Sequence, residues 1–176
     1  MLGVNKGRVV LASHEQDWKR LFEEEKHLLE SIIGDHIIDI QHIGSTAING
    51  IQAKPIIDIL VGVSDMEDVE SFDLEKLKAQ GIYRLKVKRE GKVVFAKFSS
   101  LEDKTKTHIL HVVEHGGTWW QEHTFFRDYL IQHTDTAHEY ERYKVQLANK
   151  YPTDEKTYTD EKKAFVDQIL KKRVSS

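Results

Sequence analysis

The sequence contains no cysteine, which excludes disulfide bonds and zinc sites held by thiolates. No run approaches the roughly 20 apolar residues that span a membrane, and the opening MLGVNKGRVV lacks the apolar core of a signal peptide. We therefore expect a cytoplasmic protein with no membrane partner. The formal net charge of -3 argues against a general nucleic-acid-binding surface, although a local basic patch stays open.

The composition is that of a globular protein, with 31% charged and 39% hydrophobic residues. The length of 176 residues is near that of one domain. Strand-like runs dominate up to Val113, and helical patterns follow. We expect an α/β core over residues 1–117 and a helical segment over 118–176, packed on the core as one compact unit.

The hydrophobic periodicity predicts an α/β (α+β) fold in which helices flank a mixed sheet. Helices with capping-box spacing are expected to start at Ser13 and Thr118. The expected strands are 9–11, 37–43, 56–63, 82–88, 92–98 and 107–113. The other expected helices are 66–80, 135–150 and 154–172.

The segment from His42 to Val63 holds the main candidate site. A strand that leads into the turn Gly44-Ser45 can offer backbone N–H groups and a hydroxyl to an anion. Asp58 interrupts the apolar run 56–63, and a carboxylate there is costly to bury unless a cation meets it. That cation could be a metal ion, a lysine or an arginine.

These residues also carry a resemblance. The stretch HIGSTAINGIQAKPIIDILV resembles the signature of the GrpB-like family, within the nucleotidyltransferase superfamily. The similarity continues through THILHVV (107–113), FFRDYL (125–130) and the spacings Tyr140 to Lys144 and Tyr158 to Lys162, and so covers nearly the whole chain. It implies a mixed β-sheet of the nucleotidyltransferase type flanked by helices, with a C-terminal helical segment. The family is known mainly as a fold relative of nucleotide-transferring enzymes.

The resemblance implies a phosphate and metal site. In the superfamily a Gly-Ser turn binds the triphosphate, and two carboxylates one residue apart on the next strand hold magnesium. Asp58 matches the second carboxylate, and the first falls on Ile56. Mg²⁺ held by one carboxylate and substrate phosphates is chemically feasible, but a two-metal mechanism is not supported. Alternatively, Asp58 pairs structurally and Gly44-Ser45 is only a tight turn.

Two histidines lie in the last expected strand. Alternation sends His108 and His111 to opposite faces, and the resemblance implies that His111 lies near Asp58. There it could be a general base, a metal ligand or a phosphate donor, or simply a structural residue. If His42 joined Asp58 and His111, the ligand set would suit Zn²⁺, iron or Mn²⁺ better than Mg²⁺.

Four cationic residues are candidate phosphate ligands. Lys54 precedes the Asp58 strand, and Arg127 could clamp a phosphate or pair with Asp128. Lys144 and Lys162 each follow a tyrosine by four residues and share its helix face; superfamily members often place phosphate-binding lysines in such a helical segment. The alternative for each is a solvated surface residue.

We therefore expect a protein that binds a nucleoside triphosphate with a divalent metal and transfers a nucleotidyl or phosphoryl group to an unknown acceptor. Mg²⁺ is the expected ion, with Zn²⁺ or Mn²⁺ as alternatives. Two other functions stay open: a non-catalytic module that binds a nucleotide or other phosphorylated small molecule, and a small metal-dependent hydrolase.

Overall fold

The computed structural model describes residues 2–87 and 89–174. Residues 1 and 175–176, which bound the two expected segments, lie outside the described residues. So does Lys88, the last residue of the expected strand 82–88.

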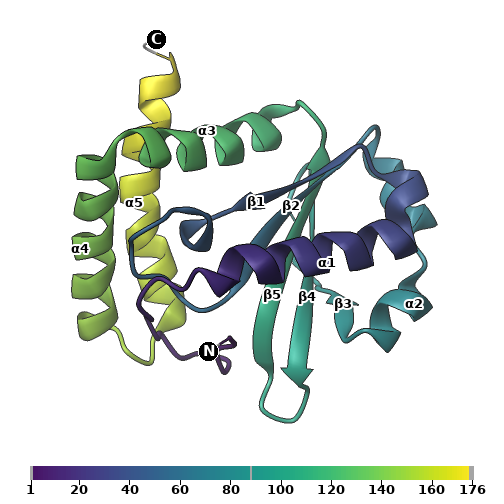
Figure 1. Cartoon of the computed structure of the whole chain (residues 1–176), viewed down its shortest axis with the longest axis horizontal. Helices are drawn as coiled ribbons and strands as arrows, with labels where there is room; N and C mark the ends of the chain where they lie inside the picture. The colour runs from purple at the N-terminus through teal and green to yellow at the C-terminus, as the bar shows by residue number, and fades with distance from the viewer. Residues whose placement is uncertain (1, 88, 175–176) are drawn as a thin grey trace.

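A five-stranded mixed sheet forms the centre of the molecule (Figure 1). Its strands are β1 Asp39–Ile43, β2 Ile57–Val63, β3 Ile82–Arg84, β4 Lys92–Ser100 and β5 Thr105–Glu114, in the order β1-β2-β5-β4-β3. Strands β2 and β5 are parallel, and the other neighbouring pairs are antiparallel. The expected mixed sheet is therefore confirmed.

Within the described residues, five α-helices and three 3₁₀ turns complete the fold. They are α1 Asp17–Ile33, α2 Leu74–Ala79, α3 Thr118–Gln132, α4 Thr134–Lys150, α5 Glu155–Val174, η1 Gly34–His36, η2 Ser45–Ala47 and η3 Met66–Ser71. Helix α1 crosses the sheet, and α3, α4 and α5 gather beyond β1 (Figure 1). None of the helices in the described ranges is long and apolar enough to cross a membrane.

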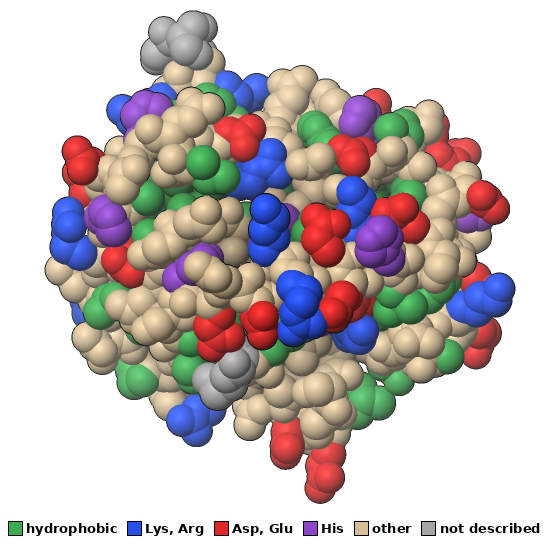
Figure 2. Space-filling model, in the orientation of Figure 1, with side chains coloured by type: hydrophobic (Ala, Val, Ile, Leu, Met, Phe, Trp, Pro, Cys, Tyr) green, Lys and Arg blue, Asp and Glu red, His purple; other side chains and the backbone are tan. Residues whose placement is uncertain are grey.

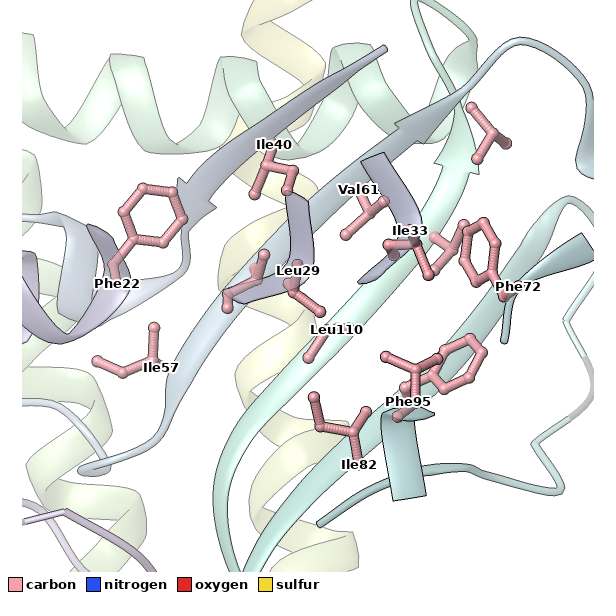
Figure 3. Packing of buried hydrophobic residues seen from close by; sticks show 14 of the residues in the cluster. Phe22, Leu29, Ile33, Ile40, Ile57, Val61, Phe72, Ile82, Phe95 and Leu110 are labelled. Carbon is pink, nitrogen blue, oxygen red and sulfur yellow. The ribbon is translucent and has the colours of Figure 1, made fainter. Parts of the chain in front are cut away.

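The main hydrophobic core lies between α1 and the sheet (Figure 3). Leu29 and Ile33 of α1 recur on one helix face and are almost fully buried against Ile59 and Val61 of β2. Strand β2 is buried along its length except at Asp58, which is partly exposed. This pattern is that of a central strand covered on both faces.

A second core joins the C-terminal helices to the loop after Ser45. Ile48 and Ile51 of that loop are buried with Phe126 of α3 and Tyr140 of α4. The loop that follows the Gly-Ser turn is therefore anchored to the helices that carry the candidate lysines.

Several local predictions are wrong. Residues 9–11 form no strand; Val9 donates instead to the carbonyl of Pro152. Helix α1 begins at Asp17 rather than after Ser13. Helix α3 begins at Thr118 as expected, but neither helix has the side-chain cap that the capping-box spacing predicted. The expected helix 66–80 is split into η3 and α2, because Asp65 and Asp73 each cap a separate start and the chain is extended at Phe72.

Candidate functional site

The Gly44-Ser45 turn lies directly against Asp58. Gly44 has φ 73°, and a Cβ atom at this position would lie 2.6 Å from Asp58 Oδ2. Only glycine fits this left-handed backbone and close approach without strain. Ser45 then starts η2, where the Ala47 amide donates to the Gly44 carbonyl at 3.1 Å. The turn thus places the Gly44 backbone against a strand carboxylate, and the next residue carries a hydroxyl.

His111 faces Asp58 across the parallel pair β2–β5. Asp58 is in register with Ile109, so His111, two residues further on, points to the same face. Its Nε2 lies 3.5 Å from Asp58 Oδ1. Burial by itself would raise the pKa of Asp58, but the interaction with His111 and the charges of Lys162 and Lys54 outweigh it, so the pKa is lowered. Asp58 is therefore ionised at neutral pH.

Lys144 of α4 reaches the Gly-Ser turn from the other side. Its Nζ donates to Ser45 Oγ at 2.8 Å and to the Gln52 carbonyl at 2.7 Å, and the residue is only 2% exposed. Burial lowers the pKa of Lys144 to about 7, and the neighbouring charge of Lys162 adds to the effect. Burial raises the pKa of Tyr140, one turn earlier in α4, against the opposing effect of Ser45.

Lys54 and Lys162 lie near the ring of Tyr158, at 4.9 and 5.5 Å from its centroid. Burial, then the charge of Lys162, lowers the pKa of Lys54 to about 8, although Glu155 lies 3.9 Å away. Burial also lowers the pKa of Lys162. Its ammonium forms no hydrogen bond or ion pair with any described residue. Lys54, Lys144 and Lys162 are called the lysine cluster below.

A group that the sequence did not reveal continues the site along the sheet. Lys92 of β4 is 7% exposed and donates to His123 Nε2 of α3 at 2.7 Å, while its ammonium lies 3.9 Å from the Trp119 ring centroid. The ring centroids of His123 and His111 are 5.2 Å apart. Burial lowers the pKa of Lys92 to about 8 and that of His123 to about 3. These residues come from separate elements, so no local pattern links them.

Two expected site residues lie elsewhere. Ile43 is the residue of β1 paired with Asp58, so His42 points to the opposite face, where it stacks on Phe22 at 4.8 Å. Arg127 Nη1 donates to the His42 carbonyl at 3.0 Å, and its Nε pairs with Asp128 at 2.9 Å. Arg127 thus makes the local ion pair and lies outside the lysine cluster.

The residues fit a divalent metal only in part. In the chain as described, no group of three or more His, Cys, Asp or Glu side chains could hold an ion, so the set of His42, Asp58 and His111 does not assemble. Ile56, at the first carboxylate position, has no oxygen to offer. Asp58 alone can supply one oxygen ligand, and phosphates and water would have to complete an octahedral Mg²⁺ site.

A family model described as GrpB protein matches residues 8–172. The chain belongs to the GrpB family. It is 61% identical over 171 residues to the glutamate-rich protein GrpB of Alkalihalophilus pseudofirmus, covering 97% of this chain and 98% of that protein. The UPF0157 protein YqkA of Bacillus subtilis is 36% identical over 92% of this chain and 46% of its own length.

Solved structures agree with this assignment. The crystal structure of the conserved protein GrpB from Enterococcus faecalis superposes with a TM-score of 0.81 at 28% identity, covering 93% of this chain and 99% of that one. The Cid1 poly(U) polymerase superposes with a TM-score of 0.52 at 13% identity, covering 78% of this chain and 44% of that one. This GrpB-family chain therefore has a fold of the nucleotidyltransferase type, as the resemblance predicted.

Proposed function

We propose that this GrpB-family protein binds a nucleoside triphosphate, with the phosphates lying among Ser45 and the lysine cluster. The observation that carries the proposal is the set of three lysines whose pKa values are all lowered, by burial and in part by one another. Grouping one buried and two partly buried cations in this way is unfavourable for an empty site. A polyphosphate would supply the missing negative charge and the acceptors for their N–H groups.

Each ligand role follows from an existing contact. Lys144 already positions the Ser45 hydroxyl, so both can donate to one phosphate oxygen after a small shift. Lys162 has an ammonium with no hydrogen-bond acceptor among the described residues, and it lies over the same tyrosine as Lys54. A chain of phosphates can therefore run from the Gly-Ser turn toward Tyr158.

We further propose transfer of a nucleotidyl or phosphoryl group from this ligand. An acceptor hydroxyl attacks phosphorus, pyrophosphate or a nucleoside diphosphate leaves, and the hydroxyl proton passes to the imidazole of His111. The Asp58 carboxylate, 3.5 Å from Nε2, stabilises the imidazolium that forms. A divalent ion held by Asp58 and the phosphates, with Mg²⁺ expected ahead of Zn²⁺ or Mn²⁺, would neutralise charge on the transferring group.

A second candidate is a non-catalytic nucleotide- or phospholigand-binding module. It is favoured by Ile56, which leaves Asp58 without the companion carboxylate that catalysis in this superfamily implies. The hydrolase alternative requires His42, Asp58 and His111 on one ion, and β1 turns His42 to the other face.

Isothermal titration calorimetry tests the binding proposal. ATP, GTP, CTP and UTP are titrated with and without Mg²⁺ into the wild-type protein, Lys162→Met and Lys163→Met. Lys163 is the matched control, because it is exposed on the same helix and paired with Asp167 at 2.9 Å. We expect Lys162→Met to weaken binding by about tenfold, or 1.4 kcal/mol, and Lys163→Met to change nothing. The absence of binding of any nucleotide to folded wild-type protein at millimolar concentration would overturn the proposal.

His111→Gln separates the two candidates. Release of pyrophosphate or orthophosphate from bound ATP is followed with water as the acceptor. A transferase loses this turnover in the variant and keeps nucleotide affinity. Equal, negligible release by wild type and variant, with affinity intact, would select the binding module.

A further inference from the structure

A cavity of about 330 Å³ lies beside the edge strand β1. Its walls come from α1, β1, the segment 46–49 and Arg127 of α3. Thr46 and Ala47 line it, whereas the Ser45 hydroxyl between β1 and α4 is held by Lys144. Ser45 therefore contacts the lysine cluster, and the next two residues of the same turn, Thr46 and Ala47, contact this cavity. The proposed triphosphate site makes no use of the cavity.

Positive charge exceeds negative charge around this cavity. Lys19, Lys26 and Arg127 line it together with one carboxylate, Glu23. Neither Lys19 nor Lys26 forms an ion pair with another described residue. Figure 2, which views this face, shows Lys and Arg side chains over α1 and below α3, with Asp and Glu side chains interspersed among them. The positions 19, 23 and 26 share one side of α1, so all three side chains project toward the same space.

Arg127 is held in place for a planar or tetrahedral anion. Its side chain is 16% exposed. Nη1 donates to Gln41 Oε1 at 2.9 Å and to the His42 carbonyl at 3.0 Å, and Nε donates to Asp128. Within the described ranges Nη2 has no partner. A guanidinium fixed on two sides, with one nitrogen left over, can bind an oxyanion with little loss of side-chain entropy.

His42 gives the cavity an uncharged wall. Burial lowers the pKa of His42 to about 4, with Arg127 opposing its protonation, so the ring is neutral at physiological pH. Its Nε2 bonds Thr46 Oγ1 at 2.9 Å, and its face stacks on Phe22. The cavity thus combines three cations with an aromatic wall, and its volume suits a small molecule rather than a polymer.

We propose that this cavity binds a small acid through a phosphate or carboxylate group. His42 and Phe22 place it on the α1 side of β1, whereas Asp58 points to the other face of the sheet, so it is a site apart from the proposed triphosphate site. Anion binding in the cavity therefore does not rest on the proposed function.

Nuclear magnetic resonance with ¹⁵N-labelled protein tests the inference. Inorganic phosphate is titrated at constant ionic strength, and acetate is titrated in a parallel arm that reports on carboxylate binding. The variants are the double substitution Lys19→Gln/Lys26→Gln, Arg127→Gln, Lys162→Met and the exposed control Lys163→Gln. The double variant changes only surface positions of α1 and keeps the core residues of that helix.

We expect saturable shifts of the amides of His42, Ala47 and Asn49 in the wild type. The shifts should weaken at least several-fold in Lys19→Gln/Lys26→Gln and Arg127→Gln, and should persist in Lys162→Met and Lys163→Gln. Shifts that are confined to Gly44 and Ser45 and vanish in Lys162→Met would overturn this inference and leave the proposed function standing. Unsaturable shifts, or equal shifts in all variants, would also overturn it. Saturable shifts here without nucleotide binding in calorimetry would support the cavity and remove the proposed triphosphate site.

Discussion

Strand β5 carries one histidine to each face of the sheet, and their surroundings differ. His108 lies on the α1 face and is 6% exposed; its Nδ1 bonds Thr107 Oγ1 at 2.8 Å, and its Nε2 lies 3.5 Å from Glu25. Lys97 donates to both oxygens of Glu25, at 2.8 and 3.0 Å. His111, on the opposite face, lies near Asp58, and its buried Nδ1 has no partner in the part of the chain that the structure describes.

The same contrast extends over the two faces. The α1 face holds the main apolar core, and Glu25, the buried carboxylate among the described residues there, meets Lys97 at hydrogen-bond distance. The other face gathers Lys54, Lys92, Lys144 and Lys162, all with lowered pKa values, around Asp58. The first arrangement favours stability. The second gathers charge at a cost to stability, which is the trade-off that the proposed binding site would require.

The largest effect should come from breaking the apolar face. Leu29→Ala removes a fully buried side chain between α1 and the sheet, and such truncations cost about 2–5 kcal/mol. Urea denaturation should show this loss, while nucleotide affinity of the folded protein stays unchanged. The control is Leu101→Ala at a position that is 58% exposed, where little change is expected. A matching loss of affinity in folded Leu29→Ala would show that the two faces are coupled.

On the other face, Asp58→Asn tests whether Asp58 is a metal ligand or a structural partner, because it removes a charge and keeps the side-chain shape. If Asp58 holds a divalent ion, affinity for ATP with Mg²⁺ falls by about tenfold, or 1.4 kcal/mol. Without Mg²⁺ the affinity should stay or rise, because a negative charge near the lysine cluster has gone. Calorimetry with and without the chelator EDTA measures both. A large ligand-independent drop in melting temperature, with Mg²⁺-dependent binding intact, would instead make Asp58 a structural partner.

Lys162→Met should act on stability and affinity in opposite directions. Replacing the partly buried ammonium of Lys162 by an apolar chain removes repulsion from Lys54 and Lys144. The free energy of unfolding of the ligand-free protein should rise by about 1 kcal/mol, a common gain at sites where function opposes stability. Denaturant titration of the variant beside Lys163→Met checks this. A destabilised Lys162→Met would mean that the cluster is held together by the fold rather than by a ligand.

The most gradual effects are changes with pH, at most about 1.4 kcal/mol per pH unit for each group. Lys144 and Lys54 release protons near pH 7 and 8 in the folded state, and their ordinary value is 10.5. The unfolded chain therefore holds more protons over this window, and stability should rise from pH 7 toward 10. Phosphate affinity should fall over the same range.

On the α1 face, His108 determines the acid limb of the dependence of stability on pH. Burial lowers the pKa of His108 to about 4, so below its ordinary value of 6.5 the unfolded chain gains a proton that the folded protein does not. Stability should therefore fall from pH 6.5 toward 4. Thermal melts of Lys144→Met and His108→Gln assign the limbs: the first should flatten only the alkaline rise, and the second should reduce only the acid loss. If neither limb changes, these pKa shifts do not determine the pH dependence.

The sequence was sufficient for the fold because the signals were long and mutually consistent. The apolar run around Asp58 marked a central strand, and helical periodicity marked α4 and α5 close to their observed limits. Short signals failed. The apolar triplet 9–11 had no neighbouring strand to pair with, and the spacing after Ser13 matched a cap four residues before the helix began.

The site was only partly accessible from sequence, for a geometric reason. The tyrosine–lysine spacings pointed to Lys144 and Lys162, which do lie together with Lys54. His42 was expected beside Asp58, but its side depends on register: pairing Ile43 with Asp58 sends the preceding residue to the far face. Lys92 and His123 meet only through tertiary packing, which no single segment encodes.

The residues of the proposed phosphate site are synthesised at widely separated times. Ser45, Lys54 and Asp58 come from the first third of the chain, whereas Lys144 and Lys162 come from α4 and α5 near its end. A growing polypeptide that has completed its sheet presents the Gly-Ser turn and the carboxylate, but not two of the three cations. A bound phosphate would join the earliest and the latest parts of the molecule to be synthesised. Such a ligand would bind tightly only to the completed chain. It should slow amide hydrogen exchange in α4 and α5 more than in α1.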